Sequence, residues 1–349
     1  MIAALDATPL TLTSGGLARY VNELSLALAR QFPDDTYALL SDQPFALPEG
    51  APANLIAGPR AGRRERWWLR GVRRAIAATG SQVFHGTNFE VPYLGRTPAI
   101  LTIHDLSPWR NPAWHAGAGR VRRRTPWLIR LHRARMILTV SEAVRREVVS
   151  YFGVAEDRVR AIPLAASDRF RPVAGQPGKP YFVFVGTLEP RKNVTALVEA
   201  WRETRAETGA GLLIAGRPRA DFVPIPPDEG ITLRGEVPDN ELPRLFSGAV
   251  ALVYPTLYEG FGLPVLEAMQ CGCPVITSRD PAVTEVSGGA AIHTCSTREI
   301  ADAMRAVAAS PELRRELRER GVARAAHFSW ARTARETHDL YREILAGAN

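Results

Sequence analysis

Short apolar runs rich in β-branched residues alternate with stretches of helical periodicity along nearly the whole chain. A parallel sheet that is covered by helices on both faces has this pattern, because its strands are buried on both sides. We therefore predict an α/β fold with doubly wound sheets. In the first half the predicted strands are residues 2–6, 37–41, 54–58, 82–86, 99–105, 136–140 and 159–164, and the predicted helices lie near 16–31, 63–79, 120–134 and 141–152.

The alternation is interrupted at residues 168–180, which are rich in proline, glycine and charge. This composition is typical of a linker, and a chain of 349 residues is long for a single core. Residues 1–170 and 171–327 are therefore predicted to form two domains, followed by a terminal helix, 328–349, that packs back on the first. The second set of predicted strands is 181–186, 211–216, 231–235, 249–255, 274–278 and 289–294.

Residues 254–278 (YPTLYEGFGLPVLEAMQCGCPVITS) join the end of a buried strand to a glycine-rich turn and a helix. Gly260 and Gly262 allow the backbone to bend sharply, and Pro264 suits the first position of the helix. In an open α/β sheet, ligands bind beyond the carboxyl ends of the strands, where the N-terminus of the next helix attracts an anion. We therefore expect this loop to face a phosphate group.

Two glutamates, Glu259 and Glu267, flank this turn. A diphosphate tolerates two nearby carboxylates only if they face hydroxyl groups, and sugar hydroxyls are suitable donors. We expect Glu267, in the first turn of the helix, to reach a ribose, and Glu259 to reach the other side of the diphosphate. The alternative is that both acids only stabilise the helix N-terminus.

Residues 182–201 repeat this arrangement, with a buried strand, Gly186, a polar loop and a helix. Arg191 and Lys192 precede that helix, where cations are unfavourable unless an anion offsets them. The basic residues of the chain are all arginines except Lys179 and Lys192, so a lysine at this position is unusual. We favour phosphate binding, and an ordinary surface pair is the alternative.

The N-terminal half has two weaker candidates for a ligand site. Gly15 and Gly16 precede an amphipathic helix, where a glycine pair allows close approach to a ligand but is also an ordinary turn. His104 and Asp105 end a predicted central strand. A histidine there is either a core residue with one hydrogen bond or a group that points into the ligand cleft.

Composition narrows the class of protein. Hydrophobic residues make up 46% and charged residues 23%, as in globular proteins, and the formal net charge of +8 favours acidic partners such as nucleotides, nucleic acid or anionic lipid. Cys271, Cys273 and Cys295 lack zinc-site spacing, and each is expected to be a buried thiol. No cluster of potential ligands has metal-site spacing, so we expect neither a metal nor a cofactor.

Membrane-spanning and secreted proteins are disfavoured by the same sequence. No apolar run approaches the roughly 20 residues that a spanning helix needs. The N-terminal MIAALDAT lacks the basic region, apolar region and cleavage site of a signal peptide. We expect a cytoplasmic protein.

The segments EGFGLPVLEAMQCGCPVITS and GTLEPRKN, together with the glycine pair near the N-terminus, resemble the retaining glycosyltransferases of family 4. The resemblance extends over TVSEAVRREV (139–148), RGEVPDNELPRLFSGA (234–249) and FSWARTARETHDLYREIL (328–345), and so over nearly the whole chain. It implies the GT-B fold, in which two Rossmann-like domains face a central cleft, with the nucleotide-sugar donor bound by the second domain and the acceptor by the first.

The resemblance also implies roles for individual residues. Glu267 would bind the nucleotide ribose, Glu259 the hydroxyls of the transferred sugar, and Lys192 with Arg191 the diphosphate, while His104 would lie beside the transferred sugar. The other implied donor contacts are Gly15, Gly16, Gly186, Thr187, Gly235, Glu236, Val237, Phe261, Gly262 and Leu263. Thr187 stands where some family members carry an arginine, so the charge of the diphosphate would have to be met by Arg191, Lys192 and helix N-termini.

The implied reaction is the transfer of a hexose from a nucleotide-sugar to an acceptor hydroxyl with retention of configuration. No carboxylate is clearly placed as a nucleophile of the kind that a retaining glycosidase uses. The mechanism that the resemblance implies is a same-face substitution in which the leaving phosphate helps to deprotonate the acceptor. The HDL and EPRKN segments resemble mannosyltransferases and rhamnosyltransferases of O-antigen and exopolysaccharide assembly. GDP-mannose is the first donor we consider, with UDP- or dTDP-sugars as alternatives.

Two segments of the first domain interleave arginine with tryptophan, RRERWWLRGVRR (63–74) and RVRRRTPWLIRLHRAR (120–135). They form either a solvated face or a patch that contacts anionic membrane lipid, which would suit a polyprenyl-linked acceptor on the inner leaflet. No recognition motif accompanies them, so we expect no nucleic acid as partner, although a basic nucleic-acid-binding protein is the competing class. A nucleotide-sugar-binding protein without transfer activity and a nucleotide-sugar 2-epimerase are further alternatives.

Overall fold

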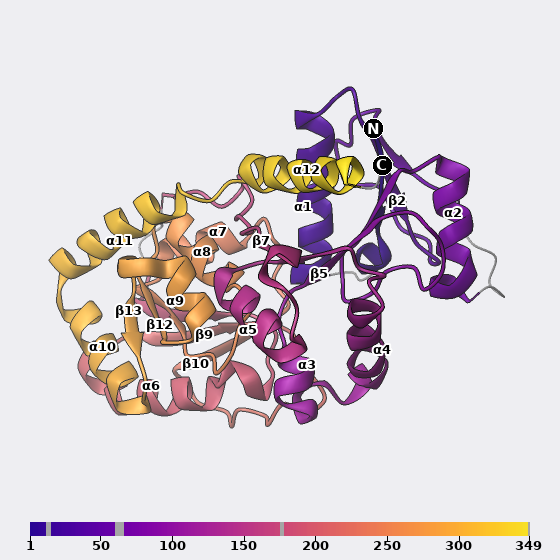
Figure 1. Cartoon of the computed structure of the whole chain (residues 1–349). Helices are drawn as coiled ribbons and strands as arrows, with labels where there is room; N and C mark the ends of the chain where they lie inside the picture. Colours follow the sequence, from indigo (N-terminus) through magenta and orange to yellow (C-terminus); the bar gives the residue numbers. More distant parts are fainter. Residues whose placement is uncertain (12–14, 60–65, 175–177, 348–349) are drawn as a thin grey trace. The chain divides into compact units, whose positions relative to one another are not determined.

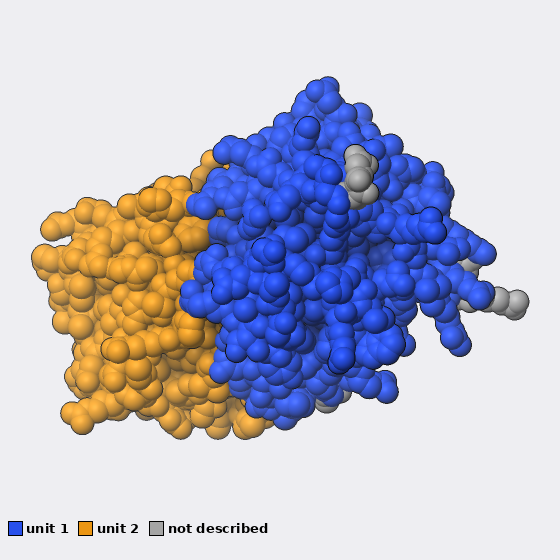
Figure 2. All heavy atoms as spheres, in the orientation of Figure 1, with its two compact units in different colours: residues 1–164, 329–349 blue, residues 165–328 orange. Residues whose placement is uncertain are grey.

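The computed structural model describes residues 1–11, 15–59, 66–174 and 178–347, and the chain divides into two compact units (Figures 1 and 2). Unit 1 comprises Met1–Leu164 and Ser329–Asn349, and unit 2 comprises Ala165–Phe328. Each unit holds one parallel sheet whose strands alternate with helices along the chain. The predicted α/β class with two Rossmann-like sheets is confirmed.

Unit 1 is built on a seven-stranded sheet of order β3-β2-β1-β4-β5-β6-β7, in which the strands pair in parallel. Its strands are β1 (Ile2–Asp6), β2 (Thr36–Leu40), β3 (Leu55–Ala57), β4 (Val83–Gly86), β5 (Ala99–Ile103), β6 (Met136–Thr139) and β7 (Val159–Ala161). We predicted that His104 and Asp105 end this strand. The prediction was wrong, because β5 ends at Ile103 and both residues follow it.

The helices of unit 1 agree with the predicted segments at 16–31 and 141–152. The unit contains η1 (Thr8–Thr11), α1 (Gly16–Gln31), η2 (Trp67–Gly71), α2 (Val72–Thr79), α3 (Ser107–Arg110), η3 (Pro112–Ala118), α4 (Gly119–Arg130), α5 (Glu142–Phe152), η4 (Glu156–Arg158) and α12 (Trp330–Ala346). Residues 63–65 of the helix predicted at 63–79 lie outside the described residues.

Unit 2 is built on a six-stranded parallel sheet of order β10-β9-β8-β11-β12-β13. Its strands are β8 (Tyr181–Val185), β9 (Gly211–Ala215), β10 (Ile231–Gly235), β11 (Ala251–Tyr254), β12 (Val275–Ser278) and β13 (Ile292–Thr294). Its helices are η5 (Pro190–Lys192), α6 (Val194–Thr208), α7 (Leu242–Gly248), α8 (Leu263–Gln270), α9 (Pro281–Ser287), η6 (Gly288–Ala290), α10 (Thr297–Ala309) and α11 (Pro311–Ala325).

Several helices begin where a short polar side chain caps the first turn. The hydroxyls of Ser141, Ser296, Ser310 and Ser329 each accept a hydrogen bond from a backbone N–H three residues later. Such caps satisfy N–H groups that have no partner within the helix. Among the helices that the structure describes, none has the length and apolar character needed to span a bilayer.

The first division between the units lies after Leu164, six residues earlier than the predicted boundary. The intervening segment packs with unit 2, because Gln270 Nε2 donates to the carbonyl of Ser167 at 3.0 Å and Phe170 contacts Phe246 at a ring distance of 6.3 Å. At the other boundary, Phe328 belongs to unit 2, because it packs edge-to-face on Phe261.

The terminal helix α12 packs in unit 1, beside α1 (Figure 1). His338 Nε2 bonds to Asp35 Oδ2 at 2.7 Å. Further along the helix, Tyr341 OH is 2.7 Å from Nδ1 of His85, which lies in β4. Both His85 and Tyr341 are fully buried, and burial lowers the pKa of His85 to about 3, so the ring is neutral. This hydrogen bond joins the end of the chain to the centre of the first sheet.

We predict that Tyr341→Phe lowers the free energy of unfolding by about 1–3 kcal/mol, because one buried nitrogen of His85 loses its partner. Urea denaturation measures this loss. Tyr151→Phe is the matched control, because Tyr151 is 55% exposed. Equal free energies of unfolding for Tyr341→Phe and Tyr151→Phe would contradict the claim that the hydrogen bond between Tyr341 and His85 stabilises the packing of α12.

Candidate active site

In unit 2 the strand order reverses between β8 and β11. Ligands of doubly wound sheets bind beyond the carboxyl ends of the strands at such a reversal. The loop after β8 holds Arg191 and Lys192, and the loop after β11 holds Glu259. The fold thus brings together Lys192 and Glu259, which are 67 residues apart in the sequence.

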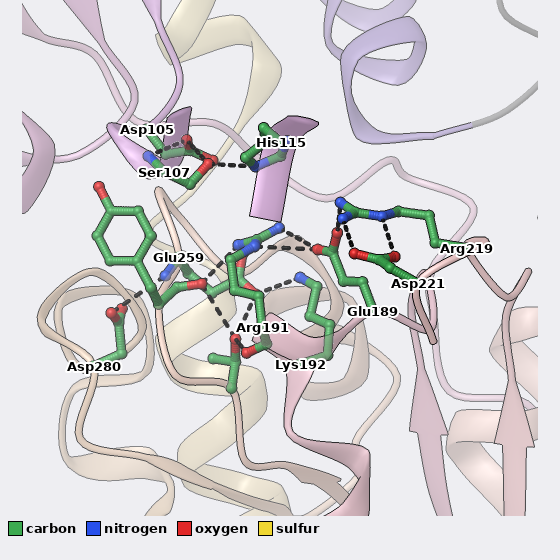
Figure 3. Close-up of polar contacts among 12 residues, drawn as sticks. Asp105, Ser107, His115, Glu189, Arg191, Lys192, Arg219, Asp221, Glu259 and Asp280 are labelled. Atoms are coloured by element: carbon green, nitrogen blue, oxygen red, sulfur yellow. Dashed lines mark hydrogen bonds and ion pairs between the residues drawn. The ribbon is translucent and has the colours of Figure 1, made fainter. Parts of the chain in front are cut away.

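Glu259 is the centre of a buried polar cluster (Figure 3). Its Oε1 accepts hydrogen bonds from Lys192 Nζ, from Tyr254 OH at 2.9 Å and from Thr256 Oγ1 at 3.0 Å. Its Oε2 accepts from Arg191 Nη1 at 3.2 Å. The carboxylate is therefore held by four donors, two of which are cations.

Arg191 is fixed equally well on its other side. Its Nε and Nη2 donate to Glu189 Oε1 at 3.1 and 2.7 Å, and Nη1 donates to the Tyr258 carbonyl at 2.6 Å. Glu189 also accepts from Arg219, which in turn pairs with Asp221 (Figure 3). The chain of alternating charges runs from the buried pair to the surface, because the Arg219 side chain is 30% exposed.

The electrostatics of the cluster favour an ionised Glu259. Burial alone would raise the pKa of this carboxyl, but the charges of Lys192 and Arg191 and the hydrogen bonds from Lys192 and Tyr254 lower it to about 2. Burial lowers the pKa of Lys192, an effect that the charge of Glu259 opposes. The negative charge that we expected to offset Arg191 and Lys192 is thus present within the protein, on Glu259 and Glu189.

The loop after β11 turns into α8 at Gly262, whose φ of 98° is a conformation that other residues rarely adopt. A Cβ atom at this position would also lie 3.2 Å from Val283 Cγ2. Because Gly262 is the N-cap, α8 begins at Leu263, and Pro264 is its second residue, not its first. Glu267 is consequently in the second turn, where we had expected the first, and it is 1% exposed.

The other donor contacts predicted in unit 2 lie at the same edge of the sheet. Gly186 and Thr187 follow β8, Gly235 ends β10 and precedes Glu236 and Val237, and Phe261, Gly262 and Leu263 follow β11. The carboxyl ends of parallel strands meet at one edge, so these loops are positioned together.

The predicted glycine pair lies in unit 1, at the start of α1. Gly15 is the N-cap with φ 116°, which requires glycine, and Gly16 is the first residue of the helix. Both residues are exposed, and no heavy atom of the described chain lies within 4 Å of where a Cβ of Gly15 would be. The backbone here is therefore accessible to a ligand.

His104 is anchored by one hydrogen bond, in which Nε2 donates to the Thr87 carbonyl at 2.8 Å. Burial lowers its pKa, so the ring is neutral at physiological pH and Nδ1 is its acceptor nitrogen. The ring packs edge-on against Tyr20 at 4.9 Å. Within the part of the chain that the structure describes, the Thr87 carbonyl is its one hydrogen-bond partner, and the half-buried ring lies at the carboxyl end of the first sheet.

Asp105 belongs to a separate group with Ser107 and His115 (Figure 3). Ser107 Oγ donates to Asp105 Oδ1 at 2.5 Å and lies 2.7 Å from His115 Nε2, so the histidine donates to the hydroxyl oxygen. In a nucleophilic triad the histidine would accept the serine proton. This group therefore orders the start of α3 and is no triad.

Asp6, the last residue of β1, is a buried acid that no sequence motif indicated, and it is 1% exposed. Its Oδ1 accepts from Thr8 N at 3.0 Å and Thr8 Oγ1 at 2.6 Å, and Oδ2 lies 3.5 Å from Thr87 Oγ1. Burial raises the pKa of Asp6 to about 7, and the charge of Glu90 adds to this effect. Since Thr87 also bonds His104, the two titratable groups share one neighbour.

Asp280 is a second acid of the site that was not predicted from the sequence. Its Oδ2 accepts from the Glu259 backbone N–H at 3.2 Å, and its Oδ1 caps α9. The available signal was an aspartate before a proline at the start of a helix, which is common and not specific. Cys271 and Cys273 are buried thiols as predicted, but Cys295 is exposed, because it precedes the cap of α10 on the surface.

We predict that Asp6 makes the protein less stable as pH rises from about 4 to 7, because the folded state keeps a proton that the unfolded state releases in this window. The slope from this one group is at most about 1.4 kcal/mol per pH unit. Asp6→Asn should remove it, as measured by urea denaturation at several pH values. The exposed Asp34→Asn is the control, and a slope unchanged in Asp6→Asn would refute the prediction.

Comparison with known proteins agrees with this geometry. Residues 14–167 match the family model of Glycosyltransferase Family 4, and residues 167–324 match that of Glycosyl transferases group 1. The chain is 34% identical over 311 residues to O-antigen chain mannosyltransferase B of Escherichia coli, which covers 80% of this chain and 77% of the relative. It is 26% identical over 395 aligned positions to a D-inositol 3-phosphate glycosyltransferase of Saccharomonospora viridis, over 97% of this chain and 91% of the relative.

Among solved structures, the fold resembles that of sucrose-phosphate synthase from Thermosynechococcus elongatus, with a TM-score of 0.79 and 20% identity over 99% of both chains. The two parallel sheets and the two family models agree. The chain belongs to family 4 of the glycosyltransferases and is a hexosyltransferase of the GT-B fold.

Proposed function

We propose that this glycosyltransferase transfers mannose from GDP-mannose to a hydroxyl group of a glycan or polyprenyl-linked acceptor in cell-surface polysaccharide synthesis. The observation that carries the proposal is the buried pairing of Glu259 with Lys192 and Arg191 at the strand-order reversal of unit 2. The 34% identity to an O-antigen chain mannosyltransferase supports the choice of sugar and of acceptor class.

In this proposal the diphosphate of the donor contacts Lys192, Arg191 and the N–H groups at the start of α8, while Glu267 binds the ribose and Glu259 a hydroxyl of the transferred sugar. His104 lies beside that sugar. The remaining donor contacts come from Gly15, Gly16, Gly186, Thr187, Gly235, Glu236, Val237, Phe261, Gly262 and Leu263. Phosphate oxygens would replace Glu259 and Glu189 as acceptors of hydrogen bonds that Arg191 donates.

The chemistry proposed is a same-face substitution without a metal ion. The bond from the anomeric carbon to the diphosphate breaks as the acceptor oxygen attacks from the same side, and the acceptor proton passes to the departing phosphate oxygen. Negative charge grows on the diphosphate during this step, and fixed cations and N–H dipoles stabilise such charge best when they are already in place. An inverted product, detected by NMR, would exclude this mechanism.

The acceptor and the location follow from the same proposal. A polyprenyl-linked acceptor would bring the protein to the inner face of the membrane, where peripheral contact with anionic lipid is expected. The relative named for D-inositol 3-phosphate suggests a second candidate, a transferase that uses a phosphorylated acceptor, and UDP- or dTDP-sugars are the alternative donors. A panel of donors separates these candidates.

We predict that GDP and GDP-mannose, without added metal, raise the melting temperature more than UDP, dTDP, ADP and their sugars do. Glu267→Gln should weaken the binding of GDP at least tenfold, because a carboxylate accepts charge-assisted hydrogen bonds from ribose hydroxyls that an amide does not match. Differential scanning fluorimetry and calorimetry give the two quantities.

The exposed Glu319→Gln is the control for this series, and it should bind GDP as the wild type does. A rise in melting temperature with UDP or dTDP alone would indicate a UDP- or dTDP-sugar as the donor in place of GDP-mannose. Undiminished GDP affinity in Glu267→Gln would contradict the assigned role at the ribose.

A further inference from the structure

Unit 1 contains a cavity of about 1100 Å³ that none of the roles above uses. Thr8 and Asp42 line one part of it and follow β1 and β2, so the cavity reaches the carboxyl edge of the first sheet. Asp6, Thr87 and His104 lie at this same edge, where the proposed function puts the reacting sugar. An acceptor whose hydroxyl reacts at this edge could therefore place the rest of its structure in the cavity.

The walls of the cavity are largely aromatic and aliphatic. Trp67 and Trp68 form a buried part, 6% and 9% exposed, and Leu128 packs beside them in the core. Trp127 and Leu131 also line the cavity but are 66% and 50% exposed. Large exposed apolar side chains that continue a cavity wall are typical of a binding site for an apolar ligand.

The same cavity is strongly basic. Its lining includes the arginines Arg66, Arg120, Arg123, Arg124 and Arg133. The nearby carboxylates are Asp42, which also lines it, and Glu90, which binds Arg120 through two hydrogen bonds of 2.9 and 2.8 Å. Among the described residues of this lining, the cationic groups outnumber the anionic ones. Each guanidinium group can donate two parallel hydrogen bonds to the oxygens of a phosphate group.

One arginine of the cavity wall is already oriented by a neighbouring tyrosine. Arg124 Nη1 donates to Tyr93 OH at 2.7 Å, and its guanidinium lies over the Tyr93 ring, 5.2 Å from the centroid. A guanidinium that is already held in one orientation loses less conformational freedom when it binds a phosphate oxygen.

We propose that this cavity binds an isoprenoid diphosphate, the lipid end of the acceptor. The chain lies against Trp68, Trp127 and Leu131, and the diphosphate contacts Arg123 and Arg124. An uncharged glycan would leave the arginines without counter-charge, and a free phosphate would leave Trp127 and Leu131 exposed to water. The inference rests on the proposed function, because it identifies the acceptor class of that reaction.

The test is calorimetric binding of farnesyl diphosphate to the full chain without donor. We expect it to bind at least tenfold more tightly than farnesol, inorganic pyrophosphate or monomeric dihexanoylphosphatidylglycerol. The double variant Arg123→Gln/Arg124→Gln and the single variant Trp127→Ala should each weaken binding at least tenfold. Controls are Arg298→Gln, an exposed arginine of unit 2, and Tyr151→Ala, which removes an exposed aromatic residue of unit 1.

Equal binding of pyrophosphate would reduce the cavity to a general anion site, and equal binding of the phosphatidylglycerol would make it a general lipid surface. Either result overturns the proposal, as does binding that the cavity variants leave unchanged or the absence of farnesyl diphosphate binding. The donor panel, repeated on the double variant, should give wild-type shifts, so failure of the lipid site and failure of the donor assignment are distinguishable.

Discussion

The site in unit 2 depends on one electrostatic constraint, the burial of two cationic side chains at the edge of a sheet. Lys192 and Arg191 are 7% and 9% exposed, and removal of each charge from water costs several kcal/mol unless it is paired and hydrogen-bonded. Glu259 and Glu189 supply the counter-charges. The pairing is possible only because β8 and β11, which carry the two loops, are neighbours in the sheet.

The turn after β11 follows from the same constraint. Glu259 must stay beside Lys192 while the chain reverses into α8 within a few residues, and Gly262 makes this possible by adopting a positive φ. The result is a set of cations held in place before a substrate arrives. In the proposed function, cations fixed in this way would stabilise the negative charge that develops on the leaving diphosphate.

The sequence was sufficient for the fold class and for most of the strands, because the β-branched runs are buried on both faces of parallel sheets. It also placed Glu259, Lys192 and Arg191 correctly on loops that meet, since carboxyl ends of parallel strands share an edge. The prediction that Glu267 lies in the first turn of α8 was wrong, because the start of the helix depends on the backbone conformation of Gly262. Asp6 was missed because its raised pKa arises from burial, which no local pattern reports.

The most direct test of this account compares GDP with guanosine in calorimetry on the wild type, Lys192→Gln and Lys179→Gln. Lys179 is the other lysine of the chain and is exposed, so it is a matched control. We expect GDP to bind Lys192→Gln at least tenfold more weakly, about 1.4 kcal/mol or more, while guanosine affinity and the control stay unchanged. Wild-type GDP affinity in Lys192→Gln would contradict the claim that the buried cations bind the diphosphate.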